Sequence, residues 1–447
     1  MTDESGSPHQ KQVGIQQERS EFSTDGAAEL VCNAIDPDQC HGLVREGRRR
    51  RVRMQRDLVR DIKRGHAWIY SAAIEPIKAP AGTVVELWDQ RGQRAIAAGI
   101  YDGDHPIPVR ICSIDPEIEV DGVWLARRLM DAWTLRQRFF DSRTTGFRWV
   151  AGEGDGVPGM ILDVYDHVAV MKLDGGAPEA FYLPKAIGNW IVENTSIETV
   201  VLRTRQRGQT GAVIAGADLP HARVALTGEQ LSATDFLENG LRFQADVFAG
   251  QKTGFFLDQR DNRELIRRLA KGKSVLNLYS FSGGFSVAAG QGGATQVTSV
   301  DIAAPAIVAS QQHWEMNELP KESHTAVVQD CFEFLESANR EGKRWDVVIC
   351  DPPSFARNER SRPQALAAYA KLGQLSARVT NRGGLLALAS CSSHVNKQAF
   401  LEANYDALGK ARRKANLLAD RGLPLDHPTP LAMPELRYLK FLLFQLD

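Results

Sequence analysis

Short apolar runs between residues 50 and 118 are interrupted by glycine and proline. Three of these runs, at 83–88, 95–101 and 108–112, have the length and composition of β-strands. Evenly spaced short strands with turn residues between them are typical of a small β-barrel. The pattern therefore predicts a β module at 45–118, with a basic segment at its start.

Beyond residue 118, the apolar residues take on the spacing of a helix at 124–140. Strand-like segments at 160–165 and 168–171 then precede a second helical pattern at 182–194. We expect a compact α+β middle domain at 119–226.

From residue 227 onward, buried strands alternate with helices. The predicted strands are 275–279, 297–300, 326–328, 347–350, 385–389 and 439–446, and a helix begins near Phe285. Strands that alternate with helices form βαβ units and a mostly parallel sheet. The fold class is therefore α/β, with this sheet in a domain at 227–447.

The composition fits several soluble domains. A chain of 447 residues exceeds what one hydrophobic core usually supports, and 43% apolar with 24% charged residues is ordinary for a globular protein. The formal net charge of −1 by itself says little about partners. No apolar run of membrane-spanning length and no signal-peptide core are visible, which predicts a cytoplasmic protein without a membrane partner. Six widely spaced cysteines without a CxxC pair suggest neither a disulfide framework nor a metal site.

Two polar segments precede the strands of the β module. Residues 1–44 have few large apolar residues and no periodicity, so we expect a disordered tail. Residues 45–64 carry nine arginines, the last of which is Arg64. This run is either a solvated linker or a patch that contacts phosphates.

A glycine turn follows the predicted strand at 275–279. Ser280, Phe281, Ser282 and Gly283 form the turn, and a helix begins immediately after it. Glycine lets the backbone pass close to a ligand at a helix N-terminus. Asp301 ends the next strand, where an acid can accept both ribose hydroxyls of an adenosine cofactor.

Two further acids follow later strands of the same sheet. Asp330 comes after the third strand and either contacts the adenine amino group or caps the next helix. The fourth strand leads into Asp351-Pro352-Pro353. Ligands bind at the carboxyl ends of strands in open α/β sheets, so we expect these acids and Pro352 to line one cofactor site. The turn lacks the GxGxxG phosphate fingerprint, which argues against an NAD-dependent dehydrogenase.

Several long motifs bring the chain close to a known family. QKTGFFLDQR at 251–260, NLYSFSGGF at 277–285, DPP at 351–353 and SCS at 390–392 resemble class I large-subunit rRNA methyltransferases of the RlmI type. RGHAWIY at 64–70 and GEGDGVPG at 152–159 are similar to the start of that family's PUA domain and to its middle-domain signature.

The resemblance covers nearly everything after residue 44. It implies an RNA-binding PUA domain at 45–118, a Rossmann-like catalytic domain at 227–447, S-adenosylmethionine as cofactor and 23S rRNA as substrate. Two features depart from the family: Ser354 stands where RlmI-like proteins often have a lysine, and the N-terminal tail is an addition. Neither alters the reaction class, but both leave the target base open.

The chemistry of this family points to Cys391. Methylation at C5 of cytosine requires a thiolate that adds to C6. Enzymes of the RlmI type carry this nucleophile at the end of the fifth strand, where Cys391 lies. A small buried residue is the other interpretation of Cys391. Cys350, at the end of an apolar strand, is expected to pack in the core.

Asp351 also has two interpretations. It either hydrogen-bonds the cytosine amino group or accepts the C5 proton, or it only forms a rigid turn with the two prolines. Amino-directed methyltransferases use a loop of Asn, Asp or Ser followed by two prolines and an aromatic residue. Ser354 occupies the aromatic position here, with Phe355 next to it. Methylation of guanine or of another base at nitrogen is therefore the second hypothesis.

Candidate RNA contacts lie in the motif at 251–260. Lys252, Gln259 and Arg260 are candidates for contacts to RNA phosphate or the cofactor carboxylate. The alternative is an ion pair of a charged residue of this motif with Asp258 or Asp261 at a helix start. A further hypothesis is a PUA-type RNA-binding protein whose catalytic domain is inactive. The retained glycine turn, Asp301, Asp351 and Cys391 argue against it. The sequence leaves open whether the chain forms a homodimer.

Overall fold

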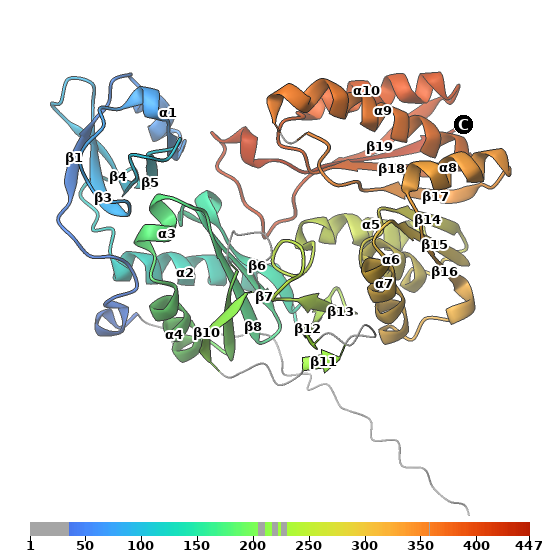
Figure 1. Ribbon diagram of the computed structural model, residues 1–447, viewed down its shortest axis with the longest axis horizontal. Helices are drawn as coiled ribbons and strands as arrows, with labels where there is room; N and C mark the ends of the chain where they lie inside the picture. The colour runs from blue at the N-terminus through green and yellow to red at the C-terminus, as the bar shows by residue number, and fades with distance from the viewer. Residues whose placement is uncertain (1–34, 204–210, 217–221, 225–229, 357) are drawn as a thin grey trace, which may run out of the picture.

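The computed structural model describes residues 35–203, 211–216, 222–224, 230–356 and 358–447. Most of the predicted tail, residues 1–34, lies outside this part of the chain. Figure 1 shows three regions in chain order: a β module (blue), a middle domain (green) and a larger α/β domain (olive to red). The α/β fold class predicted from the alternation of strands and helices is confirmed.

The β module holds a five-stranded sheet of order β1-β3-β4-β5-β2. Its elements are β1 Arg50–Arg53, α1 Val59–Lys63, β2 Trp68–Ile69, β3 Thr83–Trp88, β4 Ala95–Tyr101 and β5 Val109–Ser113. The arginine run is only partly a linker, because four of its residues form β1 and pair with β3 in parallel. Val52 anchors this strand in the core, and the arginines of β1 remain exposed.

The middle domain packs α2 Gly122–Gln137, α3 Ala177–Phe181 and α4 Pro184–Asn194 around a second five-stranded sheet. In sheet order its strands are β10 Ala212–Gly216, β9 Thr199–Arg203, β8 Val168–Leu173, β7 Met160–Tyr165 and β6 Gly146–Ala151. The rings of Trp133 and Trp149 meet edge to face at 4.5 Å in its core.

The end of the predicted tail is ordered, in contrast to the expectation of disorder up to residue 44. Residues Pro37–Cys40 form a short 3-10 helix, and Cys40, Leu43 and Val44 are buried in the core of the middle domain. The apolar residues of this segment are few and show no periodicity, so the pattern could not indicate that they join the core of the middle domain.

A three-stranded antiparallel sheet leads into the α/β domain: β11 Ala222–Val224, β12 Gln230–Glu238 and β13 Leu241–Asp246. Aromatic rings from this sheet and from the following segment pack together, with Phe236 and Phe255 at 5.1 Å. This cluster also includes Tyr165 of β7 and therefore joins the middle domain to the α/β domain.

The α/β domain is built on a seven-stranded sheet of order β16-β15-β14-β17-β18-β20-β19. The strands are β14 Ser274–Leu278, β15 Gln296–Asp301, β16 His324–Val328, β17 Trp345–Cys350, β18 Thr380–Ser390, β19 Ala415–Arg421 and β20 Lys440–Leu446. The first five strands run parallel, and β20 is antiparallel to both of its neighbours. The sheet is therefore mostly parallel, as predicted.

Helices cover both faces of this sheet (Figure 1). One face carries α5 Arg260–Leu269, α6 Gly284–Gln291 and α7 Ala304–Met316, and the other carries α8 Cys331–Arg340, α9 Arg362–Val379 and α10 Lys397–Lys410. Successive strand residues pack into different cores: Val347 contacts the first helix layer and Val348 the second. Each central strand is buried on both sides, which explains its continuous apolar run.

The loop between β19 and β20, residues 422–439, ties the three regions together (Figure 1, red). Asp426 is fully buried and accepts hydrogen bonds from Arg148 of the middle domain and Arg260 of the α/β domain. Further along, Met433 is buried in the core of the β module. Within the described residues, no helix combines the length and apolarity needed to cross a membrane.

Candidate active site

The turn after β14 is held in an unusual backbone conformation. Tyr279, Phe281 and Gly283 all have positive φ, at 56°, 46° and 79°. Gly283 cannot be replaced without strain, because a Cβ atom there would lie 2.6 Å from Cβ of Ser310. The other two residues bear side chains in a region that favours glycine, so surrounding contacts must hold them there. One such contact is the backbone N–H of Phe281, which donates to Asp301 Oδ2 at 2.9 Å.

The residues of this turn fit an adenosine cofactor that has no phosphate. Each oxygen of the half-buried Asp301 carboxylate accepts one backbone N–H, from Phe281 or Ala303, and retains a free lone pair. The hydroxyls of Ser280 and Ser282 are buried and have no hydrogen-bond partner among the described residues. Buried hydroxyl groups normally form hydrogen bonds. The two free hydroxyls are therefore suited to bind a polar ligand that lies on the turn.

Asp330 makes the contacts of a helix cap. Its Oδ1 accepts from the backbone N–H groups of Phe332 (2.9 Å) and Glu333 (3.1 Å) at the start of α8. The side chain is half-buried, and its second oxygen accepts no hydrogen bond from the described part of the chain. The adenine contact stays a prediction and does not conflict with the cap.

Asp351 and Cys391 come together at the carboxyl edge of the sheet. Asp351 directly follows β17 and Cys391 directly follows β18, and these two strands pair in parallel with Cys350 opposite Leu388. Cys391 is half-buried. Cys350 is 1% exposed and packs in the core with its sulfur 3.8 Å from the Ser376 hydroxyl. Of this pair of cysteines, only Cys391 can therefore reach a substrate at the edge.

The protein environment of Asp351 stabilises the protonated carboxyl group and so raises its pKa. Burial, reinforced by the negative charge of Asp258, raises the pKa of Asp351 to about 7. Lys252 and the side-chain amide of Gln259 oppose this shift, and Gln259 Nε2 donates to Asp351 Oδ2 at 2.9 Å. A carboxyl group with this pKa can both hold and release a proton near neutral pH.

Cys391 is not a preformed thiolate. Burial raises the pKa of its thiol to about 11, and the nearby Asp351 charge adds to the shift. The positive charges of Lys252 and Lys440 act in the opposite direction. A nucleophile at this position must therefore lose its proton when the substrate is in place.

Lys440 is a residue of the site that the sequence analysis missed. It begins β20, is 3% exposed, and its Nζ donates to the carbonyl oxygens of Ser392, Val395 and Tyr438. Burial lowers the pKa of Lys440 to about 8, and Cys391 counters part of that shift. The signal in the sequence is a single lysine at the start of a long apolar strand, which has no recognisable pattern.

Lys252 adopts the ion pair that was one of its two interpretations. Its Nζ donates to Asp258 Oδ2, which also accepts the hydroxyl of Tyr438 at 2.9 Å. These contacts hold the pKa of Asp258 below its usual range despite burial. The Lys252 side chain is 30% exposed, so a contact to a ligand remains geometrically open.

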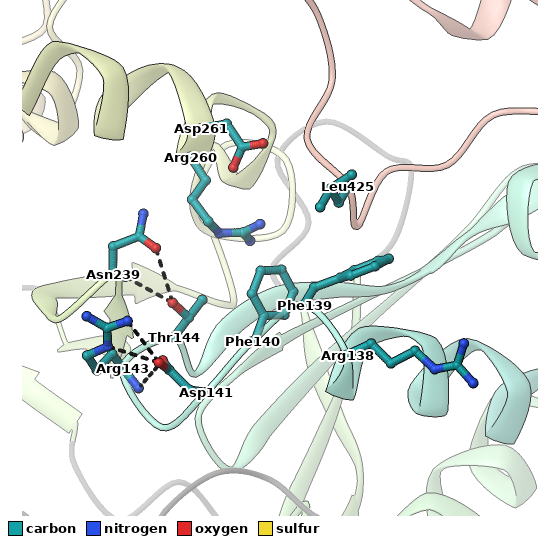
Figure 2. Close-up of a pocket in the computed structure, with 10 residues that line it drawn as sticks. All are labelled: Arg138, Phe139, Phe140, Asp141, Arg143, Thr144, Asn239, Arg260, Asp261 and Leu425. Carbon is teal, nitrogen blue, oxygen red and sulfur yellow. Dashed lines mark hydrogen bonds and ion pairs between the residues drawn. The ribbon is translucent and has the colours of Figure 1, made fainter. Parts of the chain in front are cut away.

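Arg260 differs from the prediction of an RNA contact. It is 2% exposed, its guanidinium pairs with Asp426 at 2.9 Å, and it also donates to the carbonyl of Gly146. Its guanidinium carbon lies 4.5 Å from the centroid of the Phe140 ring, and both residues line a pocket of about 360 Å³ between the middle and α/β domains (Figure 2). The partner is Asp426, 166 residues away, and not the adjacent Asp261. Arg64, in contrast, is exposed at the end of α1 in the β module.

The sheet order, the glycine turn and the acid at the end of β15 define a methyltransferase domain of the S-adenosylmethionine-dependent class. Residues 214–402 match the S-adenosylmethionine-dependent methyltransferase family, and residues 52–113 match the PUA-like domain family. The chain is thus an S-adenosylmethionine-dependent methyltransferase with a PUA-like domain.

Curated relatives define the family more narrowly. The chain is 36% identical to a ribosomal RNA large subunit methyltransferase of Deinococcus radiodurans, across 89% of this chain and 98% of the relative. It is 32% identical to ribosomal RNA large subunit methyltransferase I of Alteromonas mediterranea, across 87% and 96%. The chain belongs to this family of large-subunit rRNA methyltransferases.

Solved structures share the same fold over nearly the whole chain. One is a candidate SAM-dependent methyltransferase from Streptococcus mutans, with 24% identity, a TM-score of 0.73 and coverage of 88% of this chain and 99% of that one. Another is described as a methyltransferase complexed with SAH, with 24% identity, a TM-score of 0.76 and coverage of 89% and 99%. The fold of this chain is therefore that of S-adenosylmethionine-dependent methyltransferases.

Proposed function

We propose that this protein methylates C5 of a cytosine in large-subunit ribosomal RNA, with Cys391 as the nucleophile. The observation that carries the proposal is the placement of Cys391 and Asp351 on adjacent strand ends, at the sheet edge that also bears Asp301 and the glycine turn. The rRNA substrate is supported by the names of the relatives, whose matches cover 89% and 87% of this chain.

The residues of the site divide the chemistry between them. Bound S-adenosylmethionine supplies an electrophilic methyl group on a sulfonium centre, and Asp301, Ser280 and Ser282 would hold it at the strand edge. The Cys391 thiol would give its proton to solvent, and its sulfur would then form a bond to C6 of cytosine. The electrons of the C5–C6 double bond would move to C5, which becomes the nucleophile. After C5 has been methylated, its proton must leave, the double bond re-forms, and the C6–sulfur bond breaks.

Asp351 is suited to accept the C5 proton. Its pKa of about 7 means that a substantial fraction is ionised at neutral pH, and the proton it gains is held well enough to complete the transfer. Gln259 orients the carboxylate through its hydrogen bond to Oδ2 and is itself fixed by Asn262, whose amide donates to Gln259 Oε1 at 2.6 Å.

Nitrogen-directed methylation has weaker support from the loop after Asp351. That chemistry needs an aromatic ring that stacks on the target base. Phe355 packs against Tyr369 with ring centroids 4.8 Å apart, on the side of the core, and Ser354 donates its hydroxyl to the Ala356 carbonyl. The Phe355 ring is thus engaged by Tyr369, and Ser354 has no ring to offer.

A trapping experiment tests the C5 mechanism directly. RNA that carries 5-fluorocytidine at the target position should form a covalent adduct with the wild-type protein, because fluorine cannot leave as a proton. Cys391→Ala should abolish both the adduct and methyl transfer while S-adenosylmethionine still binds. Cys350→Ala is the matched control: it should lose some stability from its packing but keep the adduct.

The outcome separates the two chemistries. If Cys391→Ala still methylates RNA, then the C5 mechanism is wrong for this protein. Modified-nucleotide analysis of the product would in that case identify the methylated nitrogen, and the Asp351-Pro352-Pro353 loop would become the centre of the reaction.

A further inference from the structure

A strongly basic hollow lies at the pole of the α/β domain opposite to Asp351 and Cys391. It forms where β17 and β18 begin and where the preceding helices α8, α9 and α10 end. Its volume is about 400 Å³. Five arginines line it: Arg344, Arg378, Arg382, Arg412 and Arg413. The only acid in its lining is Asp447. We call this feature the arginine hollow.

Arg413 and Asp447 of the arginine hollow form an ion pair with each other. The Arg413 guanidinium donates to the carbonyl oxygens of Ala377, Thr380 and Asn381 and pairs with the Asp447 carboxylate at 3.3 Å. This arginine therefore has a structural role, since it ties the end of α9 to the end of the sheet. Within the described part of the chain, none of the other four arginines forms an ion pair with a carboxylate.

Helix ends explain only part of the remaining positive charge. Arg378 lies in the last turn of α9, where a cation stabilises the negative end of the helix dipole. Arg344, Arg382 and Arg412 lie outside the helices, in the turns and strand starts that follow them, and they are exposed. Like charges that converge on one hollow repel each other, so this arrangement raises the energy of the protein alone. A polyanion placed in the hollow would remove that cost.

We propose that the arginine hollow binds the phosphate backbone of the RNA substrate at a distance from the methylated base. The proposal rests on the proposed function, in which the substrate is RNA. Guanidinium groups match phosphate oxygens through two parallel hydrogen bonds, and each such contact releases counterions from the nucleic acid. The formal net charge of the chain is only −1, so a hollow with four arginines that form no salt bridge to any described residue is a marked local asymmetry.

The position of the hollow determines which RNA it can reach. β17 has six residues, at a rise of about 3.3 Å each, and spans the distance from the hollow to Asp351. The two places are therefore roughly 20 Å apart, along the height of the sheet. A short oligonucleotide bound at Cys391 would not extend around the domain to this pole, whereas a folded rRNA domain would. The hollow should contribute to the binding of long RNA only.

The test uses a triple variant of the full-length protein, Arg378→Gln, Arg382→Gln and Arg412→Gln. Its affinity for a transcript of a large-subunit rRNA domain should fall roughly 10- to 100-fold at low salt. The slope of log affinity against log salt should decrease by about 2–3, since each lost phosphate contact removes slightly less than one unit. Affinity for a short oligonucleotide with the target base should not change.

Two matched variants separate charge from structure. The Arg→Lys triple variant at the same positions keeps the charges and should retain most of the RNA affinity. A second control removes three lysines or arginines elsewhere that already pair with acids: Arg268→Gln, Lys321→Gln and Lys397→Gln. It removes the same number of charges and should change RNA affinity much less.

The possible failures are distinguishable. If the wild-type protein binds and methylates the transcript and the Gln triple variant equals it in affinity and salt slope, then the arginine hollow is not an RNA site and the proposed function stands. If the wild-type protein neither binds nor methylates rRNA, the proposed function itself fails. Should the triple variant lose its fold, the exposed Arg382→Gln alone carries the test, with an expected loss of several-fold in affinity and about one unit of slope.

Discussion

Lys440 Nζ donates a hydrogen bond to the carbonyl oxygen of Val395 at 2.8 Å, and so joins the last strand of the sheet to the loop that carries Cys391. Further hydrogen bonds from the same ammonium group reach the carbonyls of Ser392 and Tyr438. A lysine is almost never this buried without such partners. The three carbonyls stabilise its charge, and the charge in turn fixes the course of the loop.

Lys440→Met should disorder the position of Cys391. The variant leaves three carbonyl groups without their donor, which should lower the free energy of unfolding by about 1–3 kcal/mol. Methyl transfer should slow by about 100-fold, because displacements of 1 Å at a reacting group can cost that much. Affinity for S-adenosylmethionine, measured by calorimetry, should stay the same. Lys397→Met, at an exposed ion pair with Asp420, is the control, and normal turnover by Lys440→Met would contradict the positioning role.

Asp351 should make the stability of the protein depend on pH. Its pKa is raised from 3.8 to about 7, so the folded protein holds a proton that the unfolded chain has already released. The free energy of unfolding should therefore fall as the pH rises from about 4 to 7. Asp351→Asn should remove this part of the decline and melt at a higher temperature than the wild type at pH 8. Melting curves of both proteins at several pH values check this. If the melting temperatures of both proteins change with pH in the same way, then Asp351 does not cause the decline in stability.

The rate of methyl transfer should also depend on the ionisation of Asp351, but it should increase with pH where the stability decreases. If Asp351 accepts the C5 proton as a carboxylate, the rate of methyl transfer should rise with pH through about 7. A rate that is independent of pH between 5.5 and 8.5, in an assay limited by chemistry, would exclude Asp351 as the base. Single-turnover measurements with limiting RNA make this assay possible.

Asp301 and Asp330 should differ in their effect on cofactor affinity. If Asp301 accepts two ribose hydroxyls, Asp301→Ala should weaken S-adenosylmethionine binding by about 1–3 kcal/mol. Asp330→Ser keeps the cap of α8, because serine accepts the same backbone N–H groups, but it removes the carboxylate. A loss of affinity in Asp330→Ser would therefore report a direct adenine contact, and unchanged affinity would leave the residue as a helix cap. Full affinity in a folded Asp301→Ala protein would contradict the ribose assignment.

Asp426 should be among the most sensitive positions for stability. Asp426→Ala leaves the buried Arg260 without its counter-charge, which should cost about 3–5 kcal/mol. Asp420 lies six residues before Asp426 and forms an exposed ion pair with Lys397. Asp420→Ala removes only this pair and should cost less than about 1 kcal/mol. Urea unfolding of both variants gives the comparison, and equal costs would mean that the ion pair does not stabilise the contact between domains.

The sequence by itself determined the elements whose signals are local. The strands that lead to Asp351 and Cys391 contain continuous apolar runs, because the central strands of a sheet covered on both faces must be apolar on both sides. A polar residue follows each run, and the βαβ alternation predicts parallel strands. The sequence therefore predicted that these polar residues lie along one edge of the sheet. The motifs added the class of chemistry. The glycine turn was also predictable from the sequence, because its backbone conformation requires glycine at residue 283.

Only the tertiary structure decided which charged residues are buried and with whom. β19 escaped the sequence analysis because its residues Ala415–Arg421 are mostly exposed at the edge of the sheet and show no apolar pattern. Arg260 was expected to contact RNA or the cofactor, or to pair with Asp258 or Asp261, but its partner is Asp426, 166 residues further along the chain. Lys440 holds the Cys391 loop through backbone carbonyls, and these acceptors are present at every residue. Such contacts depend on which segments the fold brings together, so no spacing in the sequence can indicate them.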